Sequence, residues 1–426
     1  MSILNLSADA TDKLFLEYIL PGLNVEIREN TTIYDRFKTD TQHMAGKYAV
    51  FKALTASPKS ARPSSSTTMP TAKQGTYDEF ILYMKRGMYA QLQFDNLAIA
   101  CGKGEGAVMD ILESEIQAIT IYMSNKLNKQ FWGDGSGRLA QLSAATSNDP
   151  TVVINGPSFG QDSNYYTNPA NYIADGMGVD IYDTSGNLEA EDVEISSLTD
   201  SGDGTATMEM TTSVTASNDS WIFDHDTYAA SQAAGTGVPQ GLSGIIEVSN
   251  PETGITTTDF QGVDRDAYTW AQAQEVDMED GVFTNRKILE LVQECEKFGR
   301  VNALITNAPI WNSMYEKWEA DKMMPNEKAY WGGTEGLAFY GGRKGKIPII
   351  YDTDCPDNQI FAIDDSVLKV YAPTKNGMTW LPGDNGILTH VQGKDETVAS
   401  LVWYYNFGTT KPRALGKLYD VKHAAT

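Results

Sequence analysis

The amino-acid sequence predicts an α+β protein with an extended two-stranded arm, one long helix and an inserted β-rich domain. Alternating apolar and polar residues on both sides of a polar stretch at residues 57–76 indicate the two strands of the arm. An apolar stripe with helical spacing runs through residues 105–131, and short alternating runs separated by Gly, Asn and Asp fill residues 148–241. The last third of the chain alternates helix and strand, which completes the α+β pattern.

The composition is that of a globular protein with enough apolar mass for several packed cores. The 426 residues are 41% hydrophobic and 21% charged, and this length favours two or three domains. Cys101, Cys295 and Cys355 lie far apart, which excludes a disulfide framework and a four-cysteine zinc site. No apolar run approaches the roughly 20 residues that span a bilayer, and the first residues lack a signal-peptide pattern. We therefore expect a soluble protein with no membrane partner.

The net charge of −23 is concentrated in one part of the chain. Residues 139–264 contain 19 Asp and Glu and no Lys or Arg, whereas the rest of the chain is close to neutral. An acidic surface repels phosphate backbones, which argues against sequence-specific binding of nucleic acid. Two interpretations remain for this segment: a solvated acidic domain, or a surface that binds cations.

The first 45 residues predict an N-terminal arm. Leu14, Phe15, Tyr18 and Ile19 have the spacing of an amphipathic helix, which Pro21 ends. The arm has too little apolar surface to fold alone, so we expect it to pack on another part of the structure.

The arm is followed by a long predicted hairpin. Its strands are Lys47–Thr55 and Tyr77–Phe94, and the connecting residues 57–76 contain nine Ser or Thr, three Pro and no acidic residue. A loop of this composition does not bury enough surface to order itself. Its basic residues, in an acidic chain, suggest contact with a partner; a mobile surface hairpin is the alternative.

Residues 105–131 form the strongest predicted helix. Its apolar stripe consists of Val108, Ile111, Leu112, Ile116, Ile119, Met123, Leu127 and Phe131. Carboxylates gather in the first turns, and Lys126 and Lys129 lie near the end, as the helix dipole favours. At about 1.5 Å per residue the helix is roughly 40 Å long. The glycine-rich residues 133–137 end it.

Helix and strand alternate in the last third of the chain. We expect a helix with a buried face at Ile288–Phe298, a buried strand at Val301–Ile305, and a second helix capped by Asn307. Further strands of a mixed sheet are expected at residues 347–351, 359–363, 367–371 and 397–407.

Three segments suggest binding chemistry, and each has a simpler interpretation. Gly102–Gly106 lacks the spacing of a phosphate-binding loop and is interpreted as a flexible helix start. Asp183 and Glu194 partly match a calcium loop that lacks its glycine, so a β-turn is expected. Asp352–Asp357 is interpreted as a polar turn at the end of a strand. Because the four histidines are scattered and no nucleophile accompanies a base, the sequence predicts no enzyme, cofactor or metal site.

Several segments, taken in order, resemble the major capsid proteins of tailed bacteriophages, which have the Hong Kong 97-type fold. The segments that carry the resemblance are Asp35–Asp40 with Gly46–Tyr48, Phe131–Gly137, Val238–Ile245, Ala303–Trp311 and Gly345–Asp352. Each is a loose signature alone, and together they follow the order of the family over nearly the whole chain.

The resemblance implies a division of the chain into successive parts. These are an N-terminal arm (1–45), an extended loop (46–94), a peripheral domain with its spine helix (95–147), an acidic β-rich insertion (148–241), the peripheral domain continued (242–335), an axial domain (336–382) and C-terminal strands (383–426). The extended loop would lie across a neighbouring subunit. The axial domain would meet its copies around the five- and six-fold centres.

The resemblance also implies the function of a shell protein. Copies would form the pentamers and hexamers of an icosahedral virion capsid that encloses double-stranded DNA without reading its sequence, assembled in the cytoplasm of a bacterial host. Only about 45 residues precede the extended loop, so a separate scaffolding protein is implied, together with a portal. A decoration protein on the outer face is a further candidate partner. Nothing in the sequence identifies the acceptor Asn or catalytic Glu of a covalent cross-link.

We expect the extended loop to dock electrostatically. Lys59, Arg62 and Lys73 give its connecting residues 57–76 a charge of +3 in a subunit of −23, so they are predicted to contact acidic surface on an adjacent copy. The acidic insertion is expected to face outward, away from packaged DNA. The alternatives are an encapsulin-like nanocompartment shell, an acidic β-rich surface protein that is secreted and, third, a hydrolase.

Overall fold

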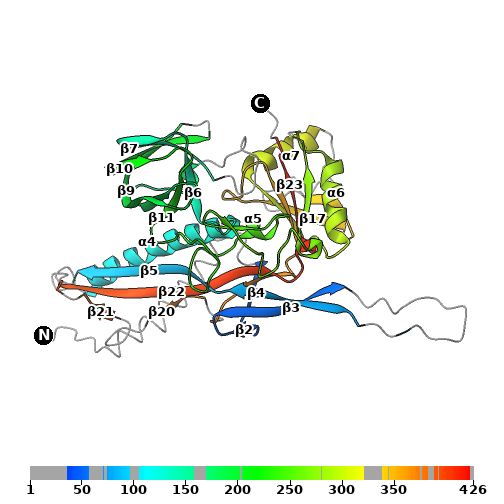
Figure 1. The fold of residues 1–426 in the computed structure, drawn as a ribbon, viewed down its shortest axis with the longest axis horizontal. Helices are drawn as coiled ribbons and strands as arrows, with labels where there is room; N and C mark the ends of the chain where they lie inside the picture. The colour runs from blue at the N-terminus through cyan, green and yellow to red at the C-terminus, as the bar shows by residue number, and fades with distance from the viewer. Residues whose placement is uncertain are drawn as a thin grey trace, which may run out of the picture.

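The structure is a computed structural model with an elongated α+β architecture, as the sequence predicts. It describes residues 36–56, 71, 74–95, 105–157, 169–201, 204–279, 281–320, 338–343, 345–374, 377–381, 388–391 and 393–422. Figure 1 shows a long strand pair at the base, a long helix lying on it, and two separate units on the other side of that helix. A β-hairpin projects beyond the rest of the molecule at one end.

The base is an antiparallel pair formed by β5 (Lys85–Asp95) and β22 (Glu396–Thr409). Helix α4 (Glu105–Trp132) lies along this pair, which confirms the predicted long helix (Figure 1). The side chains in the first half of α4 lie outside the described residues. In its second half the buried members of the predicted apolar stripe are Met123, Leu127 and Phe131.

Short strands pair with the other edge of β22 along its length. They are β21 (Leu388–His390), β20 (Thr379–Trp380) and β19 (Leu368–Tyr371), and β1 (Lys38–Asp40) adds to β19 in parallel. Lys369 Nζ donates to Asp40 Oδ2 over 2.7 Å. Burial alone raises the pKa of Asp40, but hydrogen bonds from Lys369 and His43 lower it to about 2. The described end of the predicted N-terminal arm therefore packs on its own chain.

The projecting hairpin consists of β3 (Tyr48–Ala56) and β4 (Thr76–Tyr83), with β2 (Met44–Ala45) on the outer edge of β3. The extended stretch predicted over Tyr77–Phe94 consists of two strands, because β4 ends at Tyr83 and β5 begins at Lys85. From that point β5 leaves the hairpin and pairs with β22. Both strands alternate apolar and polar residues, so their periodicity does not distinguish the two partners.

The acidic segment forms a closed six-stranded barrel, the first of the two separate units. Its strands are β6 (Arg138–Leu142), β7 (Thr146–Asn155), β8 (Gly178–Tyr182), β9 (Leu188–Asp200), β10 (Thr205–Ala216) and β11 (Trp221–Asp224), in the order β10-β7-β6-β11-β8-β9, with the short helix η3 (Pro169–Asn171) in the β7–β8 connection. Val, Ile and Met side chains fill its interior. The barrel begins at Arg138, before the limit expected at residue 148.

The second unit is a six-stranded mixed sheet with two helices, here called the α/β unit. Its elements are β14 (Gln274–Asp277), α6 (Asn285–Glu296), β15 (Ala303–Thr306), α7 (Ala308–Ala320), β16 (Ala338–Gly342), β17 (Gly345–Tyr351), β18 (Ile360–Ile363) and β23 (Gly416–Tyr419). The strand order is β14-β23-β18-β15-β17-β16. A domain boundary at residue 336 cuts through this sheet, because β17 pairs with β15.

Local signals place the ends of the helices in the α/β unit. Ile310 N donates to Asn307 Oδ1 over 3.2 Å, which confirms the predicted cap of α7. Phe298, expected on the buried face of α6, is 39% exposed because α6 ends at Glu296. The predicted buried strand is confirmed as β15, in which all residues are buried.

Short elements connect the barrel to the α/β unit and β22 to β23. They are α5 (Leu242–Ile245), β12 (Glu252–Thr253), β13 (Thr256–Thr257), η4 (Thr269–Ala271) and η5 (Pro412–Ala414). Figure 1 shows α5 beside the end of α4, where it takes part in the junction described below.

His225 joins the end of β11 to the neighbouring strand β8 of the barrel. Its Nδ1 lies 2.9 Å from Asp180 Oδ1, and its Nε2 lies 3.6 Å from Asp226 Oδ2. Asp180 also accepts hydrogen bonds from the backbone N–H groups of Asp192 and Asp226. The hydrogen bond to Asp180 raises the pKa of His225 above its usual 6.5.

We predict that the barrel loses stability as pH rises through the elevated pKa of His225. The charged imidazole is the form that Asp180 stabilises, so this contribution is complete below pH 6.5 and disappears above the folded-state pKa. Replacing His225→Asn should flatten the pH dependence of thermal unfolding above pH 6.5. The matched control is His390→Asn, because His390 is exposed on β21. Equal pH profiles for the two variants would contradict the prediction.

Candidate functional site

Two glycine-containing segments that are distant in the sequence meet at the centre of the molecule. The end of α4 with residues 133–137 contacts residues 240–245 around α5. A Cβ atom added to Gly241 would lie 2.3–2.5 Å from the carbonyl oxygens of three residues at the end of α4. Ser243 Oγ donates to Trp132 O over 2.6 Å. This contact, which we call the junction, brings together two of the segments that carry the resemblance to phage capsid proteins.

Asn406 of β22 connects the junction to the hairpin. Its Oδ1 accepts from Gln240 N over 2.9 Å, and its Nδ2 donates to Tyr83 O over 2.8 Å. Tyr83 is the last residue of β4. One buried amide therefore links the junction, the base of the molecule and the root of the projecting hairpin.

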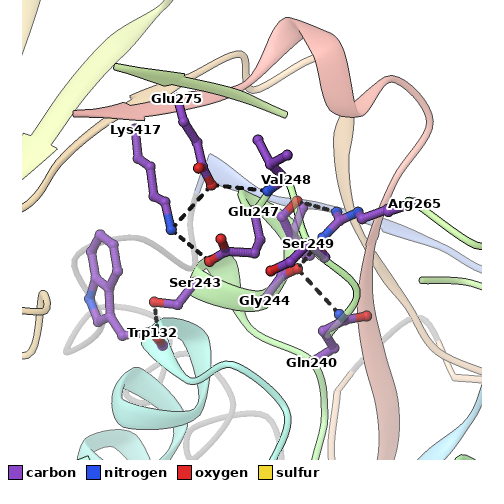
Figure 2. A network of polar contacts seen from close by, with 11 residues as sticks. Trp132, Gln240, Ser243, Gly244, Glu247, Val248, Ser249, Arg265, Glu275 and Lys417 are labelled. Atoms are coloured by element: carbon purple, nitrogen blue, oxygen red, sulfur yellow. Dashed lines mark hydrogen bonds and ion pairs between the residues drawn. The ribbon is translucent and has the colours of Figure 1, made fainter. Parts of the chain in front are cut away.

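Arg265 is the fully buried cation at one side of the junction (Figure 2). Its guanidinium donates to four backbone carbonyls, of Ala271 (3.1 Å), Gly244 (2.9 Å), Ser249 (3.3 Å) and Ile245 (2.6 Å). The ring of Phe260 lies 3.4 Å from the guanidinium carbon. Burial lowers the pKa of Arg265, opposed by Glu247 and Glu275. A guanidinium remains charged at neutral pH, so Arg265 holds four carbonyls at fixed positions.

Lys417 is the second buried cation, and it contacts two carboxylates (Figure 2). Its Nζ lies 2.6 Å from Glu247 Oε2 and 3.4 Å from Glu275 Oε1. Glu275 also accepts from Val248 N over 2.9 Å. Burial raises the pKa of Glu247 to about 7, although Lys417 opposes the shift. Because Glu275 and Lys417 are register partners on β14 and β23, this network ties the α/β unit to the junction.

Helix α4 makes a second polar contact with the α/β unit. Asn128 Nδ2 donates to Asp352 Oδ1 (3.0 Å) and to Asp354 Oδ2 (2.6 Å). Asp354 N donates to Asp352 Oδ1, which confirms the predicted polar turn after β17. Burial raises the pKa of Asp354. The two carboxylates position α4 against the end of the sheet.

The other sequence-predicted candidates fall into two groups. Asp183 Oδ1 accepts from Ser185 N (2.9 Å) and Asn187 N (2.7 Å), which confirms a β-turn in place of a calcium loop. Lys59, Arg62 and Lys73 lie outside the described residues, as do Gly102–Gly104. In the described part of the hairpin, Tyr77 is 67% exposed.

Sequence reasoning missed the charged residues of the junction. A buried Lys or Arg has the same sequence signature as an exposed one, and Glu247 lies in a segment whose acidic residues were expected at the surface. One signal was present: Arg265 is the first basic residue after the basic-free stretch 139–264. Its isolated position, directly after that stretch, marks it as a residue with a specific partner.

Two features are absent from the described part of the chain: a membrane-spanning helix and a metal-binding cluster. No helix there is long and apolar enough to cross a membrane. No three His, Cys, Asp or Glu side chains among these residues are arranged to hold a metal ion.

Comparison with known proteins identifies the fold. No family model matches the sequence, and no curated protein matches it. The structure is similar to the capsid of cyanophage A-1(L), with a TM-score of 0.50 and 11% sequence identity over 95% of this chain and 94% of that chain. The chain has a phage capsid fold. The resemblance stated from the sequence is confirmed at this level.

Two further structures are similar to this phage capsid fold. The capsid of a native GTA particle aligns with a TM-score of 0.45 and 9% identity, covering 92% of this chain and 91% of that chain. The holo-SrpI encapsulin complex from Synechococcus elongatus aligns with a TM-score of 0.41 and 9% identity, covering 92% and 90%.

We predict that Gly241→Ala strongly destabilises the capsid fold. The added methyl group would overlap backbone carbonyl oxygens, which have no free rotation to move aside, so the loss should be about 3 kcal/mol. Gly133→Ala is the matched control at the same junction, because its Cβ would meet Gln130 O at 3.4 Å. Urea unfolding of the two variants measures the difference. Equal urea midpoints for the two variants would show that the backbone around Gly241 can move to accommodate the methyl group, which would contradict the prediction.

We predict that Lys417→Met destabilises the subunit by about 3 kcal/mol, because it leaves two half-buried carboxylates without their buried cation. The loss should shrink at lower pH as Glu247 takes up a proton, and adding Glu247→Gln with Glu275→Gln should recover part of it. Lys297→Met is the control, since Lys297 pairs with Glu294 at the surface and should cost at most about 1 kcal/mol. A Lys417 variant as stable as the control would contradict the role of the junction.

Proposed function

We propose that this chain is the major capsid protein of a tailed phage, with a Hong Kong 97-type fold. Copies assemble into the pentamers and hexamers of an icosahedral shell around double-stranded DNA. The observation that supports this most is the similarity to a phage capsid subunit along 95% of the chain. The polar networks of the described residues join structural elements to one another, which fits a structural role.

The projecting hairpin supports assembly with other copies. Near its root, Phe51 and Phe80 are buried in the main core of the subunit. Toward its tip, Lys52 and the residues from Thr76 to Glu79 are exposed. A two-stranded hairpin is marginally stable alone, so its outer half requires a neighbour to cover it. Obligate assemblies bury about 2,000–5,000 Å² or more per contact, an area that an extended arm supplies well.

The arrangement of the acidic barrel supports an outward position in the shell. Figure 1 shows the barrel and the α/β unit on the same side of α4, opposite the β5–β22 base. A surface with this charge would repel packaged DNA from inside. In the proposed virion, assembled in a bacterial cytoplasm, the further partners are a separate scaffolding protein, a portal and, on the outer face, a decoration protein.

Electron microscopy of the expressed protein, alone and with a scaffolding protein, tests the proposal. Closed icosahedral particles with pentameric and hexameric capsomers are expected, and particles purified from infected cells should contain double-stranded DNA. Shells that hold a cargo enzyme in place of DNA would favour an encapsulin-like nanocompartment. A protein that remains monomeric under all these conditions would refute the proposed function.

We predict that changing Lys59, Arg62 and Lys73 together to Glu abolishes or greatly slows shell assembly. These residues give the hairpin loop its charge of +3, and reversal would repel it from an acidic neighbour. The matched control reverses Arg286, Lys297 and Lys411, three exposed basic residues outside the loop. Light scattering follows the rate of assembly. Normal particles from the loop variant would show that the loop does not dock through these charges.

A further inference from the structure

The outer surface of the barrel carries charge of one sign. Between Leu139 and Asp226 the described residues include no Lys or Arg. Glu191, Glu194 and Glu209 are exposed on the adjacent strands β9 and β10, and we call them the acidic strip. Figure 1 shows β9 and β10 on the side of the barrel away from the α/β unit of the same chain. A basic partner for the strip must therefore come from elsewhere.

The α/β unit presents a basic hairpin at the edge of its sheet. Strands β16 and β17 pair with each other, and β16 is the last strand of the sheet. Arg343 and Lys346 are exposed at the turn between them, and the sequence Tyr340–Tyr351 contains no acidic residue. This concentration of positive charge contrasts with the net charge of −23 of the chain.

The backbone of the basic hairpin is held in place by a buried carboxylate. Both oxygens of Glu296 accept from Arg343 N, over 2.8 and 3.1 Å. Gly345 has a φ of +85°, the left-handed conformation that the turn requires and that glycine adopts without strain. Arg343 and Gly345 are thus held on either side of the turn, which lowers the entropy that these residues lose when they contact a partner.

The acidic strip and the basic hairpin belong to two units, the barrel and the α/β unit, that lie on the same side of α4 (Figure 1). A contact between the barrel of one copy and the α/β unit of the next would therefore lie on a single face of a shell. Opposite charges at such a contact favour one orientation of neighbouring copies and disfavour others. The charges are exposed, so the attraction is screened by salt over about 8 Å at physiological ionic strength.

We propose that the basic hairpin of one copy, through Arg343 and Lys346, docks on the acidic strip of a neighbouring copy. This inference rests on the proposed function and names a second contact between subunits, separate from the extended loop. The occupant of the strip is another copy of this chain. The chain itself carries the complementary charge on the β16–β17 hairpin, where Glu296 holds Arg343 N, in a unit on the same side of α4 as the barrel.

A charge exchange between the two surfaces tests the proposal. Arg343→Glu with Lys346→Glu forms one variant, and Glu191→Lys with Glu194→Lys forms the other. Each alone should raise the critical concentration for shell assembly roughly tenfold, and the combined variant should return it close to the wild-type value. Arg286→Glu with Lys297→Glu is the control, with the same change of charge on α6 of the same unit. Circular dichroism of each variant shows whether the subunit is folded.

The outcomes separate the docking contact from shell assembly itself. A critical concentration that returns close to the wild-type value in the combined variant supports the contact. If the increase in the combined variant equals the product of the two separate increases, the proposal is wrong. A separate basic protein could instead bind the acidic strip of wild-type shells. If the hairpin variant assembles normally and only the barrel variant fails to bind that protein, the strip is its binding site and the proposal is wrong. Wild-type protein that forms no shells would instead refute the proposed function on which the contact rests.

Discussion

Two buried cations are held at one point of this fold by acceptors from several segments, and the arrangement of the other elements depends on that constraint. Arg265 directs its donors at backbone carbonyls around α5, and Lys417 lies between two carboxylates. A desolvated charge is stable only when its partners are fixed, so the segments that supply them are fixed as well. The end of α4, the 240–249 segment and the sheet of the α/β unit therefore form one body.

This constraint divides the molecule into preformed parts and parts that need neighbours. The barrel and the α/β unit each enclose their own hydrophobic core, and the base shares a third core with α4 and the root of the hairpin. The described outer residues of the hairpin, from Thr76 to Glu79, are exposed instead. A subunit that is rigid at the junction, with a projecting hairpin that needs a neighbour, is suited to repeated lateral contact. Each copy presents the same geometry to the next.

The periodicity of the sequence predicted elements whose signals lie within a few neighbouring residues. It did not predict features that depend on contacts between residues far apart in the sequence. The apolar stripe located α4, and the cap at Asn307 located α7, because both signals lie within one turn of the element. The change of partner at Met84 was missed, since β4 and β5 alternate in the same way. The junction was missed because burial of Arg265 and Lys417 depends on tertiary packing. The resemblance to capsid proteins named both glycine-containing segments without showing that they meet.

Hydrogen exchange measured by mass spectrometry, on isolated subunits and on assembled shells, tests most directly whether the junction is preformed while the hairpin is completed by neighbours. We expect the amides of residues 240–249 to be protected equally in both states. The amides of residues 52–56 and 76–79 should exchange rapidly in the subunit and become protected in the shell. Strong protection of these hairpin amides in the isolated subunit would show that the hairpin is complete without neighbours and would contradict this division.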